Sequence, residues 1–387
     1  MIDPALVDRV RQRLSADSQT PDLQRLAAAL RAETRAPAGD EELLRTLPQL
    51  RSELLGAGPI EPLLRDPLTT DVLVNAADDV WVDQGDGLRR TGVSFRDTAE
   101  VRGLAVRLAA LGGRRLDAAQ PWVDVRLPDG TRMHAVLPPV AGRGPYLSLR
   151  VLRQRAFTVD ELIEAGTLDP DSADLLRAIV RARLAFLVSG GTGCGKTTLL
   201  ATLLSVVPDT ERIVVVEDSG ELRPAHPHVL TLESRQANIE GAGEVTMRDL
   251  VRQALRMRPD RLVVGEVRGA EVVELLAALN TGHDGGAGTV HANSTGAVPA
   301  RLEALAALGG LGRAALHSQV LAAVQCIVHL RREGVRRVLD EISLLARRRD
   351  RVVVVPAWRR EGGAAPGSAG LRALLVERGV DPALVPP

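Results

Sequence analysis

Residues 190–197 read GGTGCGKT, and this stretch decides the fold. It matches the pattern G-x-x-x-x-G-K-[ST], in which glycines let backbone N–H groups surround phosphate oxygens. An apolar strand pattern over residues 184–189 precedes it and a helical pattern over residues 197–207 follows it, as a phosphate-binding loop requires. The sequence therefore predicts a nucleotide whose phosphates lie on the loop amides, at the start of the helix.

One lysine, Lys196, stands among the 49 lysine and arginine residues, and it occupies the loop position that reaches the β- and γ-phosphates. A compact ammonium fits inside a tight loop, whereas a planar guanidinium does not. The next hydroxyl, Thr197, is expected to coordinate Mg²⁺. We interpret Cys194 as a tolerated small residue rather than a redox switch. The predicted ATP-binding residues are Gly190, Gly191, Thr192, Gly193, Cys194, Gly195, Lys196, Thr197 and Thr198.

Two further strand patterns end in carboxylates. Residues 212–217 (RIVVVE) end at Glu217, and residues 262–264 lead through Gly265 to Glu266. In an open α/β sheet the chemistry lies at the carboxyl ends of the strands, so both carboxylates are expected near the phosphate loop. ATP hydrolysis needs Mg²⁺ and a positioned water. Thr197 and Glu266 are the predicted metal ligands, directly or through water, and the sequence leaves open which of Glu217 and Glu266 orients the attacking water.

Two histidines lie on either side of a glycine-rich segment, in residues 281–294 (TGHDGGAGTVHANS). No third metal ligand lies at a familiar spacing from His283 and His291, so a zinc site is not predicted. An imidazole can donate a hydrogen bond to a phosphate and report its loss. We interpret both histidines as γ-phosphate sensors, although the residues alone also allow a structural role for each.

The order of elements predicts two domains after a helical segment. Residues 1–55 read as helices with a break at residues 35–40, and residues 56–152 read as a small α+β domain. Residues 153–160 read as a linker. Strands and helices then alternate over residues 161–387, which predicts an α/β domain with a largely parallel sheet. The last part of this domain, residues 346–387, is not assigned, and residues 362–370 (GGAAPGSAG) are expected to be flexible.

Composition narrows the function classes. The 387 residues are 45% hydrophobic and 25% charged, and the formal net charge is zero, which gives no support for a global electrostatic grip on nucleic acid. Aromatic residues make up 2% of the chain, too few for a base-stacking platform. Two cysteines exclude a disulfide framework and a tetracysteine zinc module. With no signal-peptide pattern and no long apolar run, a cytoplasmic location is expected.

The motifs occur in the order of a known family. The chain resembles the secretion ATPases of type II and type IV systems, and is most similar to their tight-adherence (Tad/Cpa) pilus branch. The similarity runs from about residue 56 to residue 345. It rests on four segments of the predicted ATPase domain, SGGTGCGKTTLL, VVVEDSGELR, LRMRPDRLVVGEVRGAE and TGHDGGAGTVHANS, and on GPIEPLLRDPLTTDVLVN, PWVDVRLPDGTRMHAVLPP and GPYLSLR upstream of it.

The resemblance implies a RecA-like ATPase domain, an N-terminal domain on a mobile linker and a hexameric ring. It places Glu217 at the family's proposed catalytic base and Glu266 at its Walker B acid. Residues Arg126, Arg132 and Arg150 match the N-terminal-domain arginines that reach nucleotide phosphates in the family, and Arg268 is a weaker candidate for that role or for a contact between subunits. The chain departs from the family at residues 286–288 (GAG), which are expected to loosen the histidine segment.

The implied function is a hexameric motor that hydrolyses Mg-ATP and drives pilin assembly or protein secretion. Its partner would be an inner-membrane platform protein, through which the motor would lie at the membrane periphery. Two alternatives belong to other classes. One is a scaffold that assembles with nucleotide and shows little turnover, and the other is a RecA-like nucleic-acid translocase. The composition speaks against nucleic acid as a partner.

Overall fold

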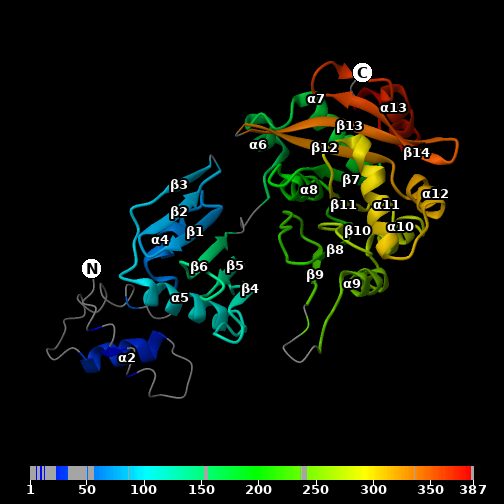
Figure 1. Ribbon diagram of the computed structural model, residues 1–387. Coiled ribbons are helices and arrows are strands. Elements are labelled where there is room, and N and C mark those ends of the chain that lie inside the picture. The colour runs from blue at the N-terminus through cyan, green and yellow to red at the C-terminus, as the bar shows by residue number, and fades with distance from the viewer. Residues whose placement is uncertain are drawn as a thin grey trace. The chain divides into compact units, whose positions relative to one another are not determined.

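The computed structural model describes residues 6, 9, 10, 13, 23–33, 50, 56–85, 87–151, 156–235, 237, 242–334 and 336–384. The chain divides into two compact units, Met1–Arg153 and Gln154–Pro387, which we call unit 1 and unit 2. Figure 1 shows that each unit is built around its own sheet. Among the described residues, no helix is long and apolar enough to span a bilayer.

The described residues of unit 1 form a six-stranded antiparallel sheet in the order β3-β2-β1-β6-β5-β4. Helix α5 (Thr98–Leu111) covers one face, and its first turn is capped by the Asp97 carboxylate, which accepts a hydrogen bond from the Glu100 amide. The short helices η1 (Gly58–Ile60) and α4 (Glu61–Arg65) precede the sheet. The strands are β1 (Asp71–Ala76), β2 (Asp79–Asp83), β3 (Leu88–Arg90), β4 (Trp122–Arg126), β5 (Arg132–Val136) and β6 (Tyr146–Arg150).

Residue alternation decides which face of this sheet is buried. Side chains alternate between faces along a strand. Val125, Met133 and Leu149 are buried in one cluster with Leu104 and Leu108 of α5. The residues that alternate with these along β4, β5 and β6 therefore point to the opposite face of the sheet. Arg126, Arg132 and Arg150 lie on that opposite face.

The predicted helical segment before unit 1's sheet is described only in part. Helix α2 spans Leu23–Glu33, and Leu26 and Leu30 are buried on one of its faces, as the spacing predicts. Its last residue, Glu33, accepts a hydrogen bond from Arg13 at 2.7 Å. The predicted break at residues 35–40 lies outside the described residues.

The described residues of unit 2 form a nine-stranded sheet in the order β15-β14-β13-β12-β7-β11-β10-β8-β9. Strands β12, β7, β11, β10, β8 and β9 run parallel, and β13, β14 and β15 continue the sheet antiparallel. The strands are β7 (Phe186–Gly190), β8 (Ile213–Glu217), β9 (Val229–Glu233), β10 (Arg261–Val264), β11 (Ala287–His291), β12 (Cys326–Glu333), β13 (Arg336–Arg348), β14 (Arg351–Arg359) and β15 (Gly363–Ala364).

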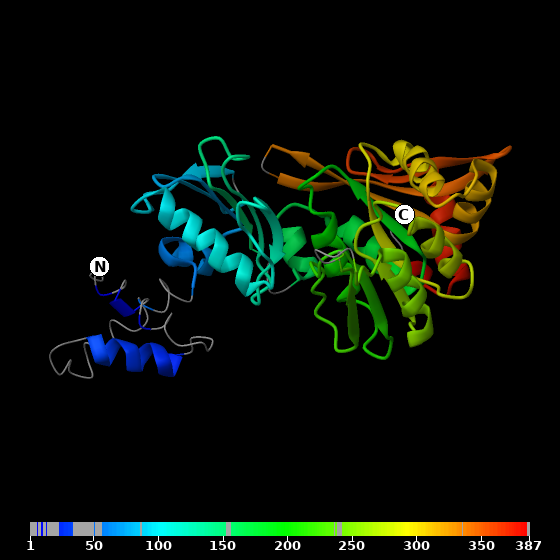
Figure 2. The same cartoon turned by 60° about the horizontal axis from the view of Figure 1, so that its bottom comes forward.

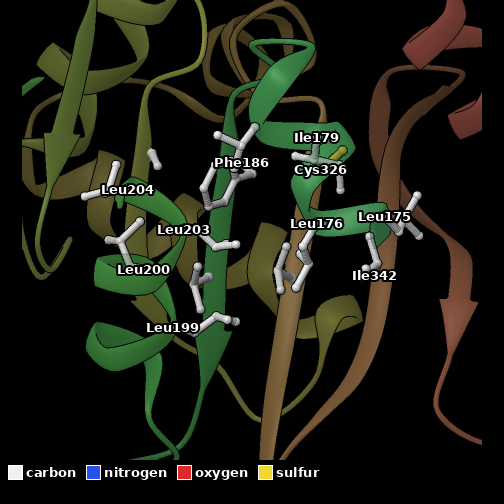
Figure 3. Packing of buried hydrophobic residues seen from close by; sticks show 14 of the residues in the cluster. Leu175, Leu176, Ile179, Phe186, Leu199, Leu200, Leu203, Leu204, Cys326 and Ile342 are labelled. Carbon is white, nitrogen blue, oxygen red and sulfur yellow. The ribbon is translucent and has the colours of Figure 1, made fainter. Parts of the chain in front are cut away.

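Helices cover both faces of this sheet, as buried apolar strands require (Figure 2). One face packs on α6 (Val159–Glu164), α7 (Pro170–Arg181), α8 (Lys196–Leu204) and α13 (Ser368–Glu377). The other packs on α9 (Met247–Ala254), α10 (Val272–Leu279), α11 (Val298–Leu308) and α12 (Arg313–Ala323). Figure 3 shows the first core, in which α7 and α8 place leucines against Phe186, Cys326 and Ile342.

Two sequence-based expectations fail at the ends of unit 2. The unassigned residues 346–387 include the end of β13, then β14, β15 and α13, so most of them belong to the sheet and to a helix on it. The glycine-rich residues 362–370 are predicted to be flexible, yet β15 pairs with β14 and the Gly367 amide donates to the Pro356 carbonyl at 2.7 Å. At the other end, α6 begins at Val159 with a capping box between Thr158 and Glu161, so the predicted linker 153–160 includes the first helical residues.

Candidate functional site

The phosphate-loop pattern forms a tight turn between β7 and α8. We call the edge of the sheet where β7, β11, β10 and β8 end its carboxyl edge, and the edge where they begin its amino edge. Gly190 ends β7, and a side chain there would clash with the Leu330 carbonyl and with Cys194 Sγ. Gly193 and Gly195 have φ of 71° and 92°, a region that favours glycine. This backbone turns successive amides toward one concave side, which is an anion-binding geometry.

The lone lysine of the chain is buried in this turn. Lys196 is 7% exposed, and its Nζ donates to the carbonyl oxygens of Gly190 at 3.2 Å and Gly191 at 2.8 Å. Burial lowers the pKa of Lys196 below its ordinary value. Its Nζ also lies 3.4 Å from His291 Nδ1. The ammonium is therefore held beside the loop by neutral carbonyl acceptors, which phosphate oxygens could replace.

His291 joins the lysine to a carboxylate that follows the neighbouring strand β10. It ends β11, which lies between β7 and β10, and it pairs in register with Gly190. Its Nε2 lies 2.7 Å from Glu266 Oε1. Burial, followed by the charge of Lys196, lowers the pKa of His291. A neutral ring with its proton on Nε2 accounts for both contacts, because Nδ1 can then accept from the ammonium.

Glu266 is further held by an arginine two residues along. Arg268 donates to Glu266 Oε2, and its Nη1 lies 3.8 Å from Asp218 Oδ2. Burial raises the pKa of Glu266, but the hydrogen bond and charge of Arg268 outweigh it and hold the pKa below its ordinary value. Glu266 is therefore ionised at neutral pH.

The residues predicted to hold Mg²⁺ fit that ion. The buried oxygen Glu266 Oε1 has no well-aligned hydrogen-bond donor among the described residues, although His291 is close to it. Thr197 is in the first turn of α8, directly after Lys196. An ionised carboxylate and a hydroxyl at the phosphate loop are hard oxygen donors, which Mg²⁺ prefers.

Glu217 is in a different state from Glu266 although their strands are neighbours. It ends β8 at 4% exposure, and its carboxylate accepts hydrogen bonds from the amides of Glu221 at 3.3 Å and Leu222 at 3.1 Å. A side chain at Gly265 would come within 2.5 Å of Glu217 Cγ, so the glycine makes room for the carboxylate. Burial raises the pKa of Glu217 to about 7.

The structure does not bring His283 to the phosphate loop. The whole of β11 separates it from His291, so His283 lies at the amino edge, where its Nδ1 is 3.1 Å from the Ala278 carbonyl oxygen. Within one chain the two predicted sensors therefore lie apart, because β11, a central strand of the sheet, runs between them. The glycine-rich segment is not loosened either, since a side chain at Gly286 would clash with Leu279 and with the Leu262 carbonyl.

The three predicted arginines of unit 1 form one row. Arg126 pairs in register with Arg132, and Arg132 with Arg150, across β4, β5 and β6. Arg150 Nε donates to Asp71 at 3.2 Å, and Arg132 Nη2 lies 3.5 Å from Asp124. Like charges directly opposite one another destabilise a sheet. Such a row is suited to an anion.

Two residues at the site escaped the sequence analysis. His329 of β12 is buried, and its Nδ1 lies 2.9 Å from the Ser189 hydroxyl, directly before the phosphate loop. Arg337 of β13 donates from Nε to the Gly193 carbonyl at 3.0 Å. Neither lies in a recognisable motif, and an arginine carries little signal in a chain with so many. Only the pairing of β12 with β7 places this hairpin beside the loop.

Comparison with known proteins identifies the family. The profile of the type II/IV secretion system protein family matches residues 53–354. A Mycobacterium tuberculosis protein that is named as a conjugal transfer protein is 59% identical over 347 residues. These residues are 88% of this chain and 99% of that protein. The type IV secretion system protein PtlH of Bordetella pertussis is 31% identical over 331 residues, which are 79% of this chain and 95% of that protein.

Solved structures agree in fold. The pilus retraction motor PilT, crystallised with ADP, superposes with a TM-score of 0.52 at 22% identity, over 73% of this chain and 80% of that chain. The predicted fold class, a RecA-like α/β domain preceded by a small α+β domain, is confirmed. The family profile covers most of the chain, and the Mycobacterium tuberculosis relative aligns over 99% of its own length. The chain therefore belongs to the type II/type IV secretion system protein family.

Proposed function

We propose that the chain is an ATP hydrolase that works as a secretion-system motor. The observation that carries the proposal is the run of contacts from Lys196 through His291 to Glu266, at the carboxyl edge and beside the phosphate loop. A loop that only bound nucleotide would need the lysine and the amides. A histidine and an ionised carboxylate next to them supply what hydrolysis needs in addition, namely a contact to the γ-phosphate and a metal-side acid.

Lys196 and the loop amides bind the phosphates. On binding, the ammonium exchanges the carbonyls of Gly190 and Gly191 for phosphate oxygens, a gain because a charged acceptor replaces neutral ones. His291, neutral and with its proton on Nε2, is placed to turn from Glu266 toward the γ-phosphate. This assigns the sensor role to His291 and leaves His283 without it.

Glu217 is our choice for the group that takes the proton of the attacking water. A general base works best when its pKa lies near the operating pH, and burial brings the pKa of Glu217 to about 7. Glu266 does not suit that role because Arg268 holds its pKa low. Two carboxylates on neighbouring strands are thus divided by environment into a base and a metal-side acid.

Thr197 and Glu266 would hold Mg²⁺, directly or through water. Bound there, the ion would neutralise charge on the transferred phosphoryl group. The arginine row of unit 1, Arg126, Arg132 and Arg150, is the proposed source of further positive charge for the nucleotide phosphates. Two observations support this role for the row. One is the resemblance to the N-terminal-domain arginines of the family, and the other is the strand register that places the three arginines side by side.

The proposed assembly is a hexameric ring of the tight-adherence pilus branch, at the periphery of the inner membrane. It would drive pilin assembly or protein secretion through a membrane platform protein. Support comes from the family membership and from PilT, a pilus motor of the same fold.

The first test measures phosphate release by the full chain and by Lys196→Ala, with particle mass from light scattering with and without ATP. Lysine-dependent turnover in a particle of about six chains is expected. Assembly with ATP but no phosphate release would replace the motor by a nucleotide-gated scaffold. Turnover that survives in Lys196→Ala would remove the phosphate loop from the mechanism.

A second setting merits a test because of one observation. The Mycobacterium tuberculosis relative and TrbB of Rhizobium radiobacter, 30% identical over 285 residues, are both named for conjugal transfer. A translocase acting on DNA would show ATP turnover stimulated by single- or double-stranded DNA at moderate salt. We expect no stimulation, and a severalfold rise would move the proposal from pilus assembly to DNA transfer.

A further inference from the structure

The β12–β13 hairpin forms a wall beside the phosphate loop. Leu330 of β12 pairs in register with Gly190, and Arg331–Glu333 run on past the end of β7. The hairpin is braced by its own ion pairs, since Arg331 Nε lies 2.5 Å from Asp340 and its Nη2 lies 2.5 Å from Glu333. It therefore offers a fixed base for any side chain that it directs toward the loop.

One side chain of this wall contacts the loop. Arg337 Nε donates to the Gly193 carbonyl at 3.0 Å. Its stem packs on the loop as well, because a side chain at Gly195 would come within 3.2 Å of Arg337 Cδ. Cys194 lies between these two glycines. Burial raises the pKa of its thiol, and the positive charge of Arg337 opposes part of that rise. The guanidinium of Arg337 thus bonds Gly193, and its aliphatic stem lies beside Gly195.

The geometry of the loop gives this contact a consequence for binding. The left-handed glycines 193 and 195 turn the loop amides inward to form an anion nest. The Gly193 carbonyl, at an exposed residue of this loop, accepts its hydrogen bond from the Arg337 guanidinium. A charged donor supplies a stronger hydrogen bond than a neutral one. Arg337 therefore holds the loop from outside in the conformation that phosphates require.

We propose that Arg337 is a positioning residue of the nucleotide site, an external brace that preorganises the phosphate loop and so sets the affinity for the diphosphate part of ADP and ATP alike. The proposal rests on the proposed function, because it concerns the same loop. A brace acts before chemistry and equally on both nucleotides, since both carry the α- and β-phosphates. It adds a cation from the same unit as the loop, independent of the arginines of unit 1.

The test is titration calorimetry of the full chain with Mg-ADP and with a non-hydrolysable Mg-ATP analogue, together with steady-state turnover. In Arg337→Met, which keeps the length of the side chain and removes donor and charge, both dissociation constants should rise about tenfold. KM should rise with them, and kcat at saturating ATP should stay within about twofold. Arg337→Lys, which keeps a charged donor, should recover most of the affinity.

Arg336→Met is the matched control, because this exposed neighbour loses the same charge but points to the other face of β13. It should bind nucleotide as the wild type does. Equal losses of nucleotide affinity in Arg336→Met and Arg337→Met would show that the effect comes from net charge alone, and would overturn the proposed brace. So would unchanged affinity in Arg337→Met, or a loss for the ATP analogue alone, which would place the guanidinium on the γ-phosphate.

The failure of this inference is distinguishable from failure of the proposed function. A wild type that binds neither nucleotide would contradict the proposed function itself. A wild type that binds both while Arg337→Met binds them equally well would contradict only the brace. Because Arg337 lies on the surface of the hairpin and its Nε bonds a loop carbonyl rather than the core, Arg337→Met should melt at the wild-type temperature, and that measurement shows that both proteins are folded.

Discussion

The two edges of the sheet in unit 2 carry similar charged residues in different states. At the amino edge, Arg261 is 1% exposed and fully engaged, with Nε on Glu211 at 2.7 Å and Nη2 on the Val180 carbonyl at 2.9 Å. At the carboxyl edge, Lys196 has a lowered pKa and Glu217 a raised one. A satisfied buried charge holds structure. A buried group whose pKa is strongly perturbed, at the carboxyl ends of the strands, marks a candidate functional site.

Glu217→Gln is expected to have the largest effect and tests the carboxyl edge. Removal of a general base costs turnover a factor of about 10²–10⁴. Nucleotide affinity should remain near that of the wild type, because the proposed phosphate contacts are made by the loop and Lys196. Phosphate release and ADP titration of the same preparation check this. Turnover within tenfold of the wild type would move the base to another group.

Arg261→Met tests the amino edge in the opposite sense. Removal of one partner of a buried ion pair should lower the free energy of unfolding by about 3 kcal/mol. Turnover per folded molecule should not change, since Arg261 lies a full strand away from the phosphate loop. Denaturant unfolding and kinetics at low temperature check both parts. Exposed Arg181→Met is the control and should leave stability within about 0.5 kcal/mol. A loss of turnover per folded molecule in Arg261→Met would show that the amino edge also contributes to function.

The stability of the wild type should itself depend on pH through Glu217. Burial raises its pKa from an ordinary 4.5 to about 7, so the folded chain binds this proton more tightly than the unfolded chain. The stabilisation is complete below about pH 4.5 and is lost as pH rises through 7, a change of about 3 kcal/mol. Glu217→Gln should remove this slope and be more stable than the wild type at pH 8.

Turnover should change with pH in the opposite direction to stability, because the proposed base is the ionised form of Glu217. We expect kcat to rise as pH passes through about 7. Unfolding curves at pH 5 and pH 8 and a kcat profile over the same range test both trends. A Glu217→Gln variant with the wild-type stability slope would show that another group titrates.

The two histidines give the smallest and most selective comparison. His291→Gln should lower turnover about tenfold, because it removes the bridge between Lys196 and Glu266. His283→Gln should change turnover less than about twofold, because its ring bonds the end of α10 at the amino edge. Parallel assays of the two variants are the measurement. Equal losses would mean that His283 acts on a phosphate outside its own unit.

Much of the site could be predicted because its signals are local. The phosphate loop has a fixed spacing. Glu217 ends β8 and Glu266 follows the end of β10, and the parallel direction of these strands follows from their alternation with helices. Each of these features depends on a few neighbouring residues, so the sequence alone contains the physical reason for it.

Long-range placement could not be predicted in the same way. His283 and His291 are close in sequence, but a strand of the sheet carries them to opposite edges, and a glycine-rich pattern is typical of a loop. Residues 362–370 look flexible, yet packing on β14 orders them. The role of Arg337 could not be predicted, because it depends on a hydrogen bond to Gly193, 144 positions away in the chain. Only the pairing of β12 with β7 brings the two residues together.

The solitary lysine gives the chain an unusual reactivity toward amine-selective reagents. Acylating and aldehyde reagents attack the neutral amine, and the same burial that lowers the pKa of Lys196 and increases the neutral fraction also limits access to a side chain only 7% exposed. Apart from the α-amino group, such a reagent can mark only the phosphate loop. The extent of modification, read by mass spectrometry, therefore reports how often the loop is occupied, and an amine cross-linker will join few copies of this chain however closely they assemble.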